Sequence, residues 1–191
     1  MAKAADCVAN SLPKLPNLKV ATRRNYQGGD IDLALYDTGS EHIFLIEVKT
    51  VYDKHRVDSL NHRFEDAKVN VKKAVAQLRK TALFFEASQK NLKNIFGDEL
   101  PLPKKTHLVL LTWFDSIDLT MGTDNEDVIS LNFSQLRFLI NKSNGNLEAM
   151  AKSIHELRNI WLMSKERKLD VGQPQLNSSL EVQVNMLDDR E

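Results

Sequence analysis

The sequence predicts a mixed α/β domain in which a central mixed β-sheet is flanked by helices, with extra helices toward the C-terminus. Two short segments rich in β-branched residues, 31–36 and 42–50, flank a turn around Gly39, which is typical of a β-hairpin. From 64 to 87 the apolar residues change to helical spacing, which predicts a long amphipathic helix. The nearly continuous apolar run 107–114 then predicts a strand buried on both faces.

Weaker signals predict the other elements in order along the chain. Pro13 and Pro16 end a first short helix, because proline fixes φ and lacks a backbone donor. A loop containing Gly97 is expected after the long helix. The remaining predicted elements are a helix at 2–12, strands at 18–22 and 128–131, and helices at 133–142 and 147–164.

Composition limits the classes of protein that the chain can belong to. Of its 191 residues 42% are hydrophobic and 27% charged, which is typical of a globular protein. Lys plus Arg and Asp plus Glu both total 26, so any nucleic-acid partner must be held by local patches. The single Cys7 excludes an intramolecular disulfide and a cysteine-based zinc site. With no signal-peptide pattern, we expect a soluble cytoplasmic protein with one domain at 1–164 and a flexible polar tail at 165–191.

The hairpin carries an unusual group of charges at one end. If it folds about Gly39 and Ser40, Asp32 lies opposite Glu47 and Asp30 lies opposite Lys49, and all four side chains share one face. Two carboxylates ~4 Å apart repel by roughly 4 kcal/mol at an effective dielectric near 20. A hard divalent cation such as Mg²⁺ or Mn²⁺ would offset this repulsion, because it prefers oxygen ligands.

Such a metal site would be suited to phosphate chemistry. A bound metal ion lowers the pKa of a water molecule and neutralises charge on a phosphate. Lys49 would orient that water or stabilise the charge that develops in the transition state. The alternative interpretation, a solvated salt-bridge cluster at the end of a hairpin, stays open at this point.

These two segments resemble the PD-(D/E)XK nuclease superfamily, in particular its restriction-endonuclease-like and junction-resolvase-like branches. The resemblance is carried by Gly-Asp-Ile-Asp-Leu at 29–33 and Phe-Leu-Ile-Glu-Val-Lys-Thr at 44–50. It implies a restriction-endonuclease-like fold, metal ligands from Asp32, Glu47 and the Val48 carbonyl, and Lys49 as the catalytic lysine. It also implies a site role for Gln77 on the following helix, for which a solvated surface glutamine is the other interpretation.

The chain departs from the family pattern at two places. Many members carry a glutamate in the first helix, whereas Asp6 is the only acid in that segment here. Some branches have an aromatic residue four positions after the glutamine, where this chain has Thr81.

Basic residues gather near the motif despite the neutral total charge. A segment between the lysine strand and the long helix, expected to be a loop at 51–63, is well placed to bind phosphates. The lysines of the long helix are also explained by simple solvation of its outer surface. The candidate nucleic-acid-binding residues are Arg23, Arg24, Lys54, Arg56, Arg63 and Lys73.

Two hypotheses of function follow. The first is a Mg²⁺-dependent nuclease that hydrolyses phosphodiester bonds of DNA, in restriction, repair or defence against mobile elements. DNA is favoured over RNA and an endonuclease over an exonuclease, and both choices stay open at this point. The resemblance is also compatible with a homodimer or a larger complex. The second is a catalytically inactive module on a nuclease-like fold that binds nucleic acid or a protein partner, because a fold does not fix a function.

Overall fold

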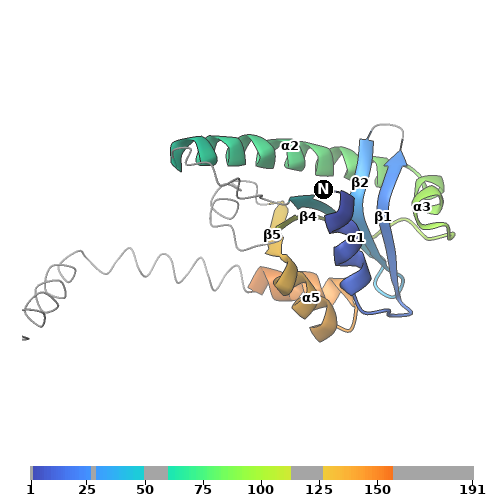
Figure 1. Cartoon of the computed structure of the whole chain (residues 1–191). Helices are drawn as coiled ribbons and strands as arrows, with labels where there is room; N and C mark the ends of the chain where they lie inside the picture. The colour runs from blue at the N-terminus through green and yellow to red at the C-terminus, as the bar shows by residue number, and fades with distance from the viewer. Residues whose placement is uncertain (1, 27–28, 50–59, 113–126, 157–191) are drawn as a thin grey trace, which may run out of the picture. The chain divides into compact units, whose positions relative to one another are not determined.

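A five-stranded mixed sheet in the order β1-β2-β3-β4-β5 forms the centre of the fold (Figure 1). The computed structural model describes residues 2–26, 29–49, 60–112 and 127–156. β1, β2 and β3 pair antiparallel, whereas β3, β4 and β5 pair parallel, which confirms the predicted mixed sheet. The strands are β1 Leu18–Tyr26, β2 Gly29–Asp37, β3 His42–Lys49, β4 Lys105–Thr112 and β5 Val128–Asn132.

Helices flank this sheet, as the sequence predicts. Contacts between residues divide the chain into a unit Met1–Ser153, which contains the strands β1 to β5, and a unit Ile154–Glu191. Residues 147–156 are also helical, and the expected remainder of that helix lies outside the described residues. The same is true of the expected tail and of the end of the strand expected at 107–114. The labelled helices are α1 Ala2–Ser11, α2 Leu60–Ala87, α3 Gln89–Phe96 and α5 Phe133–Lys142.

The loop expected after the long helix contains a helix, α3, that the sequence analysis missed. The Ser88 side chain accepts a hydrogen bond from the Lys90 N–H at its start, and Gly97 ends it with a left-handed φ of 81°. Leu92 and Ile95, three residues apart, are buried. Both a serine cap and a glycine cap are therefore present in the sequence, but the helix is only eight residues long.

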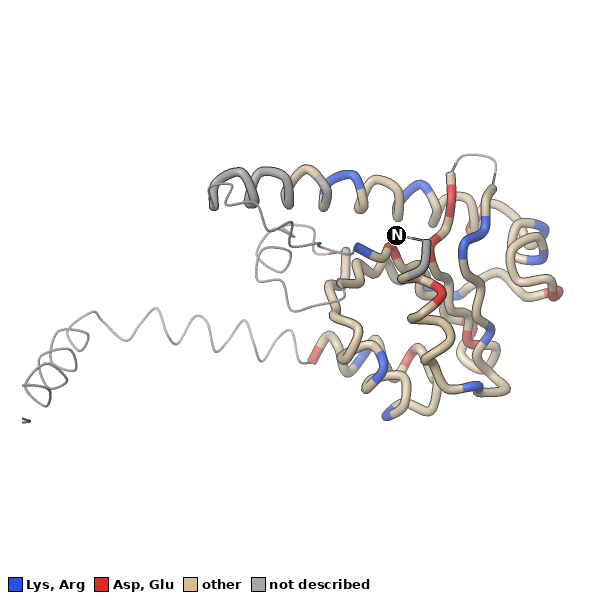
Figure 2. The backbone as a smooth tube through the Cα atoms, viewed as in Figure 1, with Lys and Arg blue, Asp and Glu red and all other residues tan. Residues whose placement is uncertain are grey.

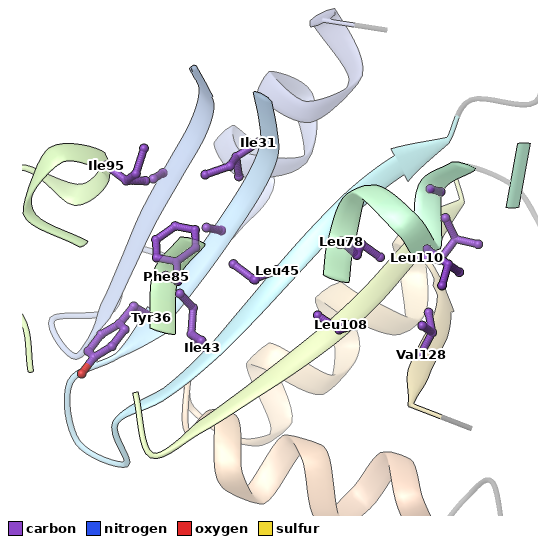
Figure 3. Close-up of a cluster of buried hydrophobic side chains, with 14 of the residues drawn as sticks. Ile31, Tyr36, Ile43, Leu45, Leu78, Phe85, Ile95, Leu108, Leu110 and Val128 are labelled. Atoms are coloured by element: carbon purple, nitrogen blue, oxygen red, sulfur yellow. The ribbon is translucent and has the colours of Figure 1, made fainter. Parts of the chain in front are cut away.

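A hydrophobic core cluster lies between the sheet and the helices α2 and α3 (Figure 3). Side chains of alternate strand residues point to opposite faces of the sheet. The side chains of Ala34, Tyr36, Ile43, Leu45, Leu108 and Leu110 join this cluster with Val71, Leu78 and Phe85 of α2. The intervening residues Leu33, Leu35, Phe44, Ile46, Val109 and Leu111 are also buried, on the opposite face.

The register of the β2–β3 hairpin agrees with the turn predicted at Gly39 and Ser40. Its ladder runs from Asp37 paired with His42 to Leu33 paired with Ile46 and ends there. The two charged pairs expected beyond Leu33, Asp32 with Glu47 and Asp30 with Lys49, are therefore not rungs of the ladder, and that part of the prediction is wrong. The two strands separate where the charges begin.

The pairing of β1 with β2 is also interrupted at Asp32. Their register is constant from Leu18 to Tyr26, but the Arg23–Asp32 pair is missing from it. Arg23 has a φ of 49°, a left-handed conformation that a non-glycine residue adopts only rarely. Uninterrupted alternation would place Ile31 on the face of Leu33, but Ile31 joins the cluster under α2. The break in pairing at Asp32 explains why the predicted alternation fails there.

Among the residues that the structure describes, no helix is both long and apolar enough to cross a membrane.

Candidate acid–lysine site

The Asp32 side chain makes a hydrogen bond to β3 just beyond the last backbone pair of the β2–β3 ladder. Its carboxylate Oδ2 accepts a hydrogen bond of 2.9 Å from the Val48 N–H of β3. The donor would otherwise be unpaired at this point of the sheet, and a buried backbone donor needs a partner. The separated strands thereby bring a carboxylate directly against the segment that carries Glu47 and Lys49.

Glu47 and Lys49 form a close ion pair on one face of β3. Residues two apart on a strand share a face, and the Lys49 Nζ lies 2.7 Å from the Glu47 Oε1. Glu47 is only 5% exposed, and the Lys49 side chain is 22% exposed. Removing one partner of a buried pair leaves an uncompensated charge, whereas the intact pair adds little stability. Its burial therefore favours a functional role over a stabilising one.

One lysine faces three acids in this group, and the pKa values of two of these acids, Asp32 and Glu47, are raised. Burial raises the pKa of Glu47, and the charges of Asp32 and Asp30 raise it further against the opposing effect of Lys49. Burial likewise raises the pKa of Asp32, against the hydrogen bond from Val48 and the charge of Lys49. Buried acids with raised pKa values and a specific charge partner are typical of functional sites. We call Asp30, Asp32, Glu47 and Lys49 the acid–lysine site.

Gln77 reaches this site from α2. Its Nε2 donates hydrogen bonds to the Asp30 Oδ1 at 2.8 Å and to the Asp30 backbone oxygen at 3.2 Å. Gln77 is half-buried, so it is not simply a solvated surface residue. The structure therefore places Gln77 against Asp30, and the charge of Asp30 acts in turn on Asp32 and Glu47.

Oxygen atoms are the donors that this site offers to a metal ion. They come from Asp32 and Glu47, and the Val48 N–H is already bonded to Asp32. Within the described parts of the chain, no group of three or more His, Cys, Asp or Glu side chains is arranged to hold a metal ion. A cation here would accordingly be held by two carboxylates together with backbone and solvent oxygens, a set that suits Mg²⁺.

The only acid of the first helix has a different partner. Asp6 Oδ2 of α1 lies 3.0 Å from Arg23 NH1 of β1. Both side chains are exposed. Asp6 therefore pairs with a basic residue next to the site.

The basic residues named from the sequence are divided between β1 and α2. Figure 2 shows lysines and arginines along α2 and at one end of β1, next to the acidic end of β2. Arg24 is exposed on β1, and Lys73 is exposed one turn before Gln77 on α2. Arg63 lies in α2, which begins at Leu60, so the loop expected at 51–63 is wrong for residues 60–63, and its remainder lies outside the described residues. Its side chain, like the whole of Lys54 and Arg56, is not among the described parts.

Two residues beside the site were not singled out by the sequence analysis as part of it. The Tyr26 hydroxyl lies 3.0 Å from Thr81 Oγ1, and Thr81 donates a hydrogen bond of 2.9 Å to the Gln77 carbonyl. Tyr26 and Thr81 are 55 positions apart in the sequence. No local pattern reports a contact over that distance.

A scan against models of protein families finds no match to this chain, and searches of curated proteins and of solved structures find none either.

Proposed function

We propose that this protein is a metal-dependent nuclease that hydrolyses phosphodiester bonds of DNA in the cytoplasm, with the acid–lysine site as its active site. The single observation that carries the proposal is the 2.7 Å pair of Lys49 with the buried Glu47, beside an Asp32 carboxylate that is held by the Val48 N–H. The resemblance of these segments to the PD-(D/E)XK superfamily supports the same conclusion, with a restriction-endonuclease-like fold. The order of two antiparallel pairings followed by two parallel ones is compatible with it.

Mg²⁺ or Mn²⁺ is the cofactor that fits the donors of this site. Asp32 and Glu47 would hold the ion, with the Val48 carbonyl as the third protein ligand that the resemblance implies. When bound, such an ion lowers the pKa of water and neutralises negative charge on a phosphate. The uncompensated charge of the acids supports this assignment, because a divalent cation relieves the repulsion between them.

The side chains have separate tasks in this proposal. Lys49 supplies positive charge next to the scissile phosphate and stabilises the negative charge that develops on its oxygens. Gln77 holds Asp30 at the edge of the site. Arg24 and Lys73 contact the flanking phosphates, a type of contact that supplies affinity without sequence information.

The test compares two Glu–Lys ion pairs at the two ends of β3. Glu47→Gln and Lys49→Met are expected to lower the rate of cleavage of linear and circular DNA in Mn²⁺ by at least about 10²-fold. The matched controls are Glu41→Gln and Lys104→Met, because Glu41 and Lys104 form a 2.9 Å pair at the opposite end of the strand. These controls should cleave at the rate of the unsubstituted protein. Undiminished cleavage by Glu47→Gln, or cleavage in excess chelator, would contradict the proposal.

A second candidate is a module that binds nucleic acid or a protein partner without cleaving. It is favoured by the pairing of Asp6 with Arg23 and by the absence, within the described residues, of a group of three metal-ligating side chains. Titration calorimetry with Mn²⁺ and then with DNA separates the two candidates. Binding of DNA without any binding of Mn²⁺ would support the second one.

A further inference from the structure

The end of the β1–β2 hairpin lies beside α2 (Figure 1), and two side-chain hydrogen-bonding contacts join them. Tyr26 contacts Thr81 at 3.0 Å, and Asp30 accepts a hydrogen bond of 2.8 Å from Gln77. On the hairpin, Tyr26 pairs with Gly29 and therefore lies one rung from Asp30. On the helix, Gln77 and Thr81 are four residues apart and lie on the same side. The two contacts are thus adjacent links between the same two elements.

The hydrogen-bond directions within this group follow from its chemistry. Thr81 has one hydroxyl proton, and the Gln77 carbonyl oxygen can only accept. The 2.9 Å bond from Thr81 Oγ1 to the Gln77 oxygen uses that proton. Tyr26 must therefore be the donor in its 3.0 Å contact with Thr81. A chain of two donated protons runs from Tyr26 through Thr81 to the backbone of Gln77.

Packing fixes the Tyr26 ring in the place that this chain needs. The ring stacks on Phe84 of α2 with centroids 4.2 Å apart. A Cβ on Gly29 would lie 3.1 Å from the Tyr26 hydroxyl oxygen, so glycine permits the close approach. Thr81 is only 3% exposed, and a buried hydroxyl is normally fully hydrogen-bonded. The contact is thus a built feature of the interior rather than a surface encounter.

The consequence for the site passes through Asp30. This residue lies outside the β2–β3 ladder, which ends at Leu33, so the ladder does not hold it toward β3. Its carboxylate is held by Gln77, and its charge acts on Asp32 and Glu47. Any sliding of α2 past the hairpin tip would move Gln77 away from Asp30.

We propose that Tyr26 and Thr81 are positioning residues, whose hydroxyl contact locks α2 against the hairpin tip so that Gln77 holds Asp30 beside the acid–lysine site. The effect of the Tyr26–Thr81 contact on catalysis rests on the proposed nuclease function. The geometric part of the proposal, the control of the Gln77–Asp30 contact by Tyr26 and Thr81, does not.

The experiment removes each hydroxyl with the least change of shape. Tyr26→Phe keeps the stacked ring, and Thr81→Val keeps the volume of the side chain. Thr81→Ser restores the hydroxyl. Tyr36→Phe is the matched control, because the Tyr36 hydroxyl donates a 3.0 Å hydrogen bond to the Pro101 carbonyl oxygen, outside the acid–lysine site. We would measure kcat and KM for DNA cleavage in Mn²⁺, together with the ¹H–¹⁵N resonances of the Gln77 side-chain amide.

Tyr26→Phe and Thr81→Val are expected to lower kcat about 10- to 100-fold, the scale of a small misplacement in an active site, with little change in KM. Both should shift the Gln77 amide resonances. Thr81→Ser and Tyr36→Phe should keep the kcat and the resonances of the unsubstituted protein. Equal kcat values for Thr81→Val and Thr81→Ser, or Gln77 resonances unchanged in Tyr26→Phe, would overturn the proposal.

The two readouts separate failure of this proposal from failure of the proposed function. If the unsubstituted protein cleaves no DNA, the nuclease function is wrong and the resonances alone decide whether Tyr26 and Thr81 control the Gln77 contact. If it cleaves and the resonances shift without a loss of kcat, the positioning role in catalysis is wrong. Tyr26→Phe decides both questions even if Thr81→Val does not fold, because it leaves the stacking on Phe84 in place.

Discussion

Asp32 and Asp37 lie on the same strand, but their pKa values are shifted in opposite directions. Burial raises the pKa of Asp32 more than the single Val48 N–H and Lys49 lower it. Burial also acts to raise the pKa of Asp37, but four hydrogen bonds together outweigh it and the pKa is lowered. The ionised Asp37 therefore stabilises the fold. The ionised Asp32 destabilises it, as expected for a group kept to bind a ligand.

We predict that Asp32→Asn makes the protein more stable at pH 8 while abolishing DNA cleavage. A folded-state pKa above the unfolded value means that stability is lost as pH rises through the raised pKa. Asparagine does not ionise, and its oxygen still accepts from the Val48 N–H. Urea unfolding at pH 8 and at pH 3 measures this. We expect Asp32→Asn to have a higher free energy of unfolding than the unsubstituted protein only at pH 8. A lower free energy of unfolding than that of the unsubstituted protein at pH 8 would show that the acid is structural.

The opposite result is expected for Asp37→Asn, which should lose about 2–4 kcal/mol of stability at pH 7. Asp37 Oδ1 accepts from Asn17 and Gly39, and Oδ2 accepts from Ser40 and Leu147. An amide has one oxygen, so its NH₂ group would face two donors. Because the pKa of Asp37 is lowered, its contribution is present above the unfolded pKa and is lost as pH falls through the folded pKa. The difference between the two proteins should therefore shrink in urea unfolding below pH 4.

At the scale of elements, a contact between two histidine side chains joins β3 and β4. His107 Nε2 lies 3.1 Å from His42 Nδ1, and burial lowers the pKa of His107 to about 4. In the folded state His107 is therefore neutral at pH values where the unfolded chain binds a proton. Stability is complete above about pH 6.5 and falls as pH is lowered toward 4.

The expected loss from His107 over this range is on the order of 3 kcal/mol. His107→Phe, which can pack on Phe44 as the histidine ring does, should remove that part of the pH dependence. Urea unfolding between pH 7 and pH 4 measures this. The quantity to compare between the two proteins is the slope of the free energy of unfolding against pH. Parallel slopes would assign the pH dependence to other groups.

Two glycines at the ends of helices provide a matched pair. Gly97 and Gly145 have φ values of 81° and 76°. A Cβ on Gly97 would meet nothing within 4 Å, whereas one on Gly145 would lie 2.6 Å from Leu15 Cδ1. Alanine at either position is expected to lower the stability by about 1 kcal/mol, because a residue with a Cβ is strained in the left-handed conformation. Gly145→Ala should lose about 1 kcal/mol more, because Leu15 must move. Thermal unfolding of both variants tests this, and an equal loss would mean that Leu15 moves freely.

Much of the arrangement of elements follows from local patterns in the sequence. The hairpin register follows from turn chemistry at Gly39 and Ser40, and α2 follows from its helical periodicity. The predicted site residues are close in the structure because a strand of period two carries Glu47 and Lys49 on one face. α3 was missed because a helix of eight residues shows barely two turns of periodicity.

What local patterns do not report is the set of contacts between distant segments. The break in pairing at Arg23 and Asp32 depends on a left-handed backbone, for which arginine gives no signal. The pairing of Asp6 with Arg23 and that of Tyr26 with Thr81 join different elements. Alternation alone placed Ile31 on the wrong face for the same reason, since a periodic pattern assumes an uninterrupted ladder.

At the scale of the whole molecule, binding of a metal ion should appear as added stability. A ligand that binds only the folded state at 100 times its Kd adds about 2.7 kcal/mol. We expect the thermal midpoint of the unsubstituted protein and of Glu41→Gln to rise with Mn²⁺ concentration and to return in chelator. Asp32→Asn should show no rise. A rise of the same size in Asp32→Asn would place the cation elsewhere.

The bond from the Leu147 N–H to Asp37 has a consequence for synthesis of the chain on the ribosome. It joins residues 110 positions apart, so the β2–β3 turn gains its last hydrogen-bond donor only after that much further polypeptide has been made. Until then the nascent hairpin carries a buried acid with an incomplete set of donors. The strands that present Asp32 and Glu47 therefore reach their final stability only after residue 147 has been added.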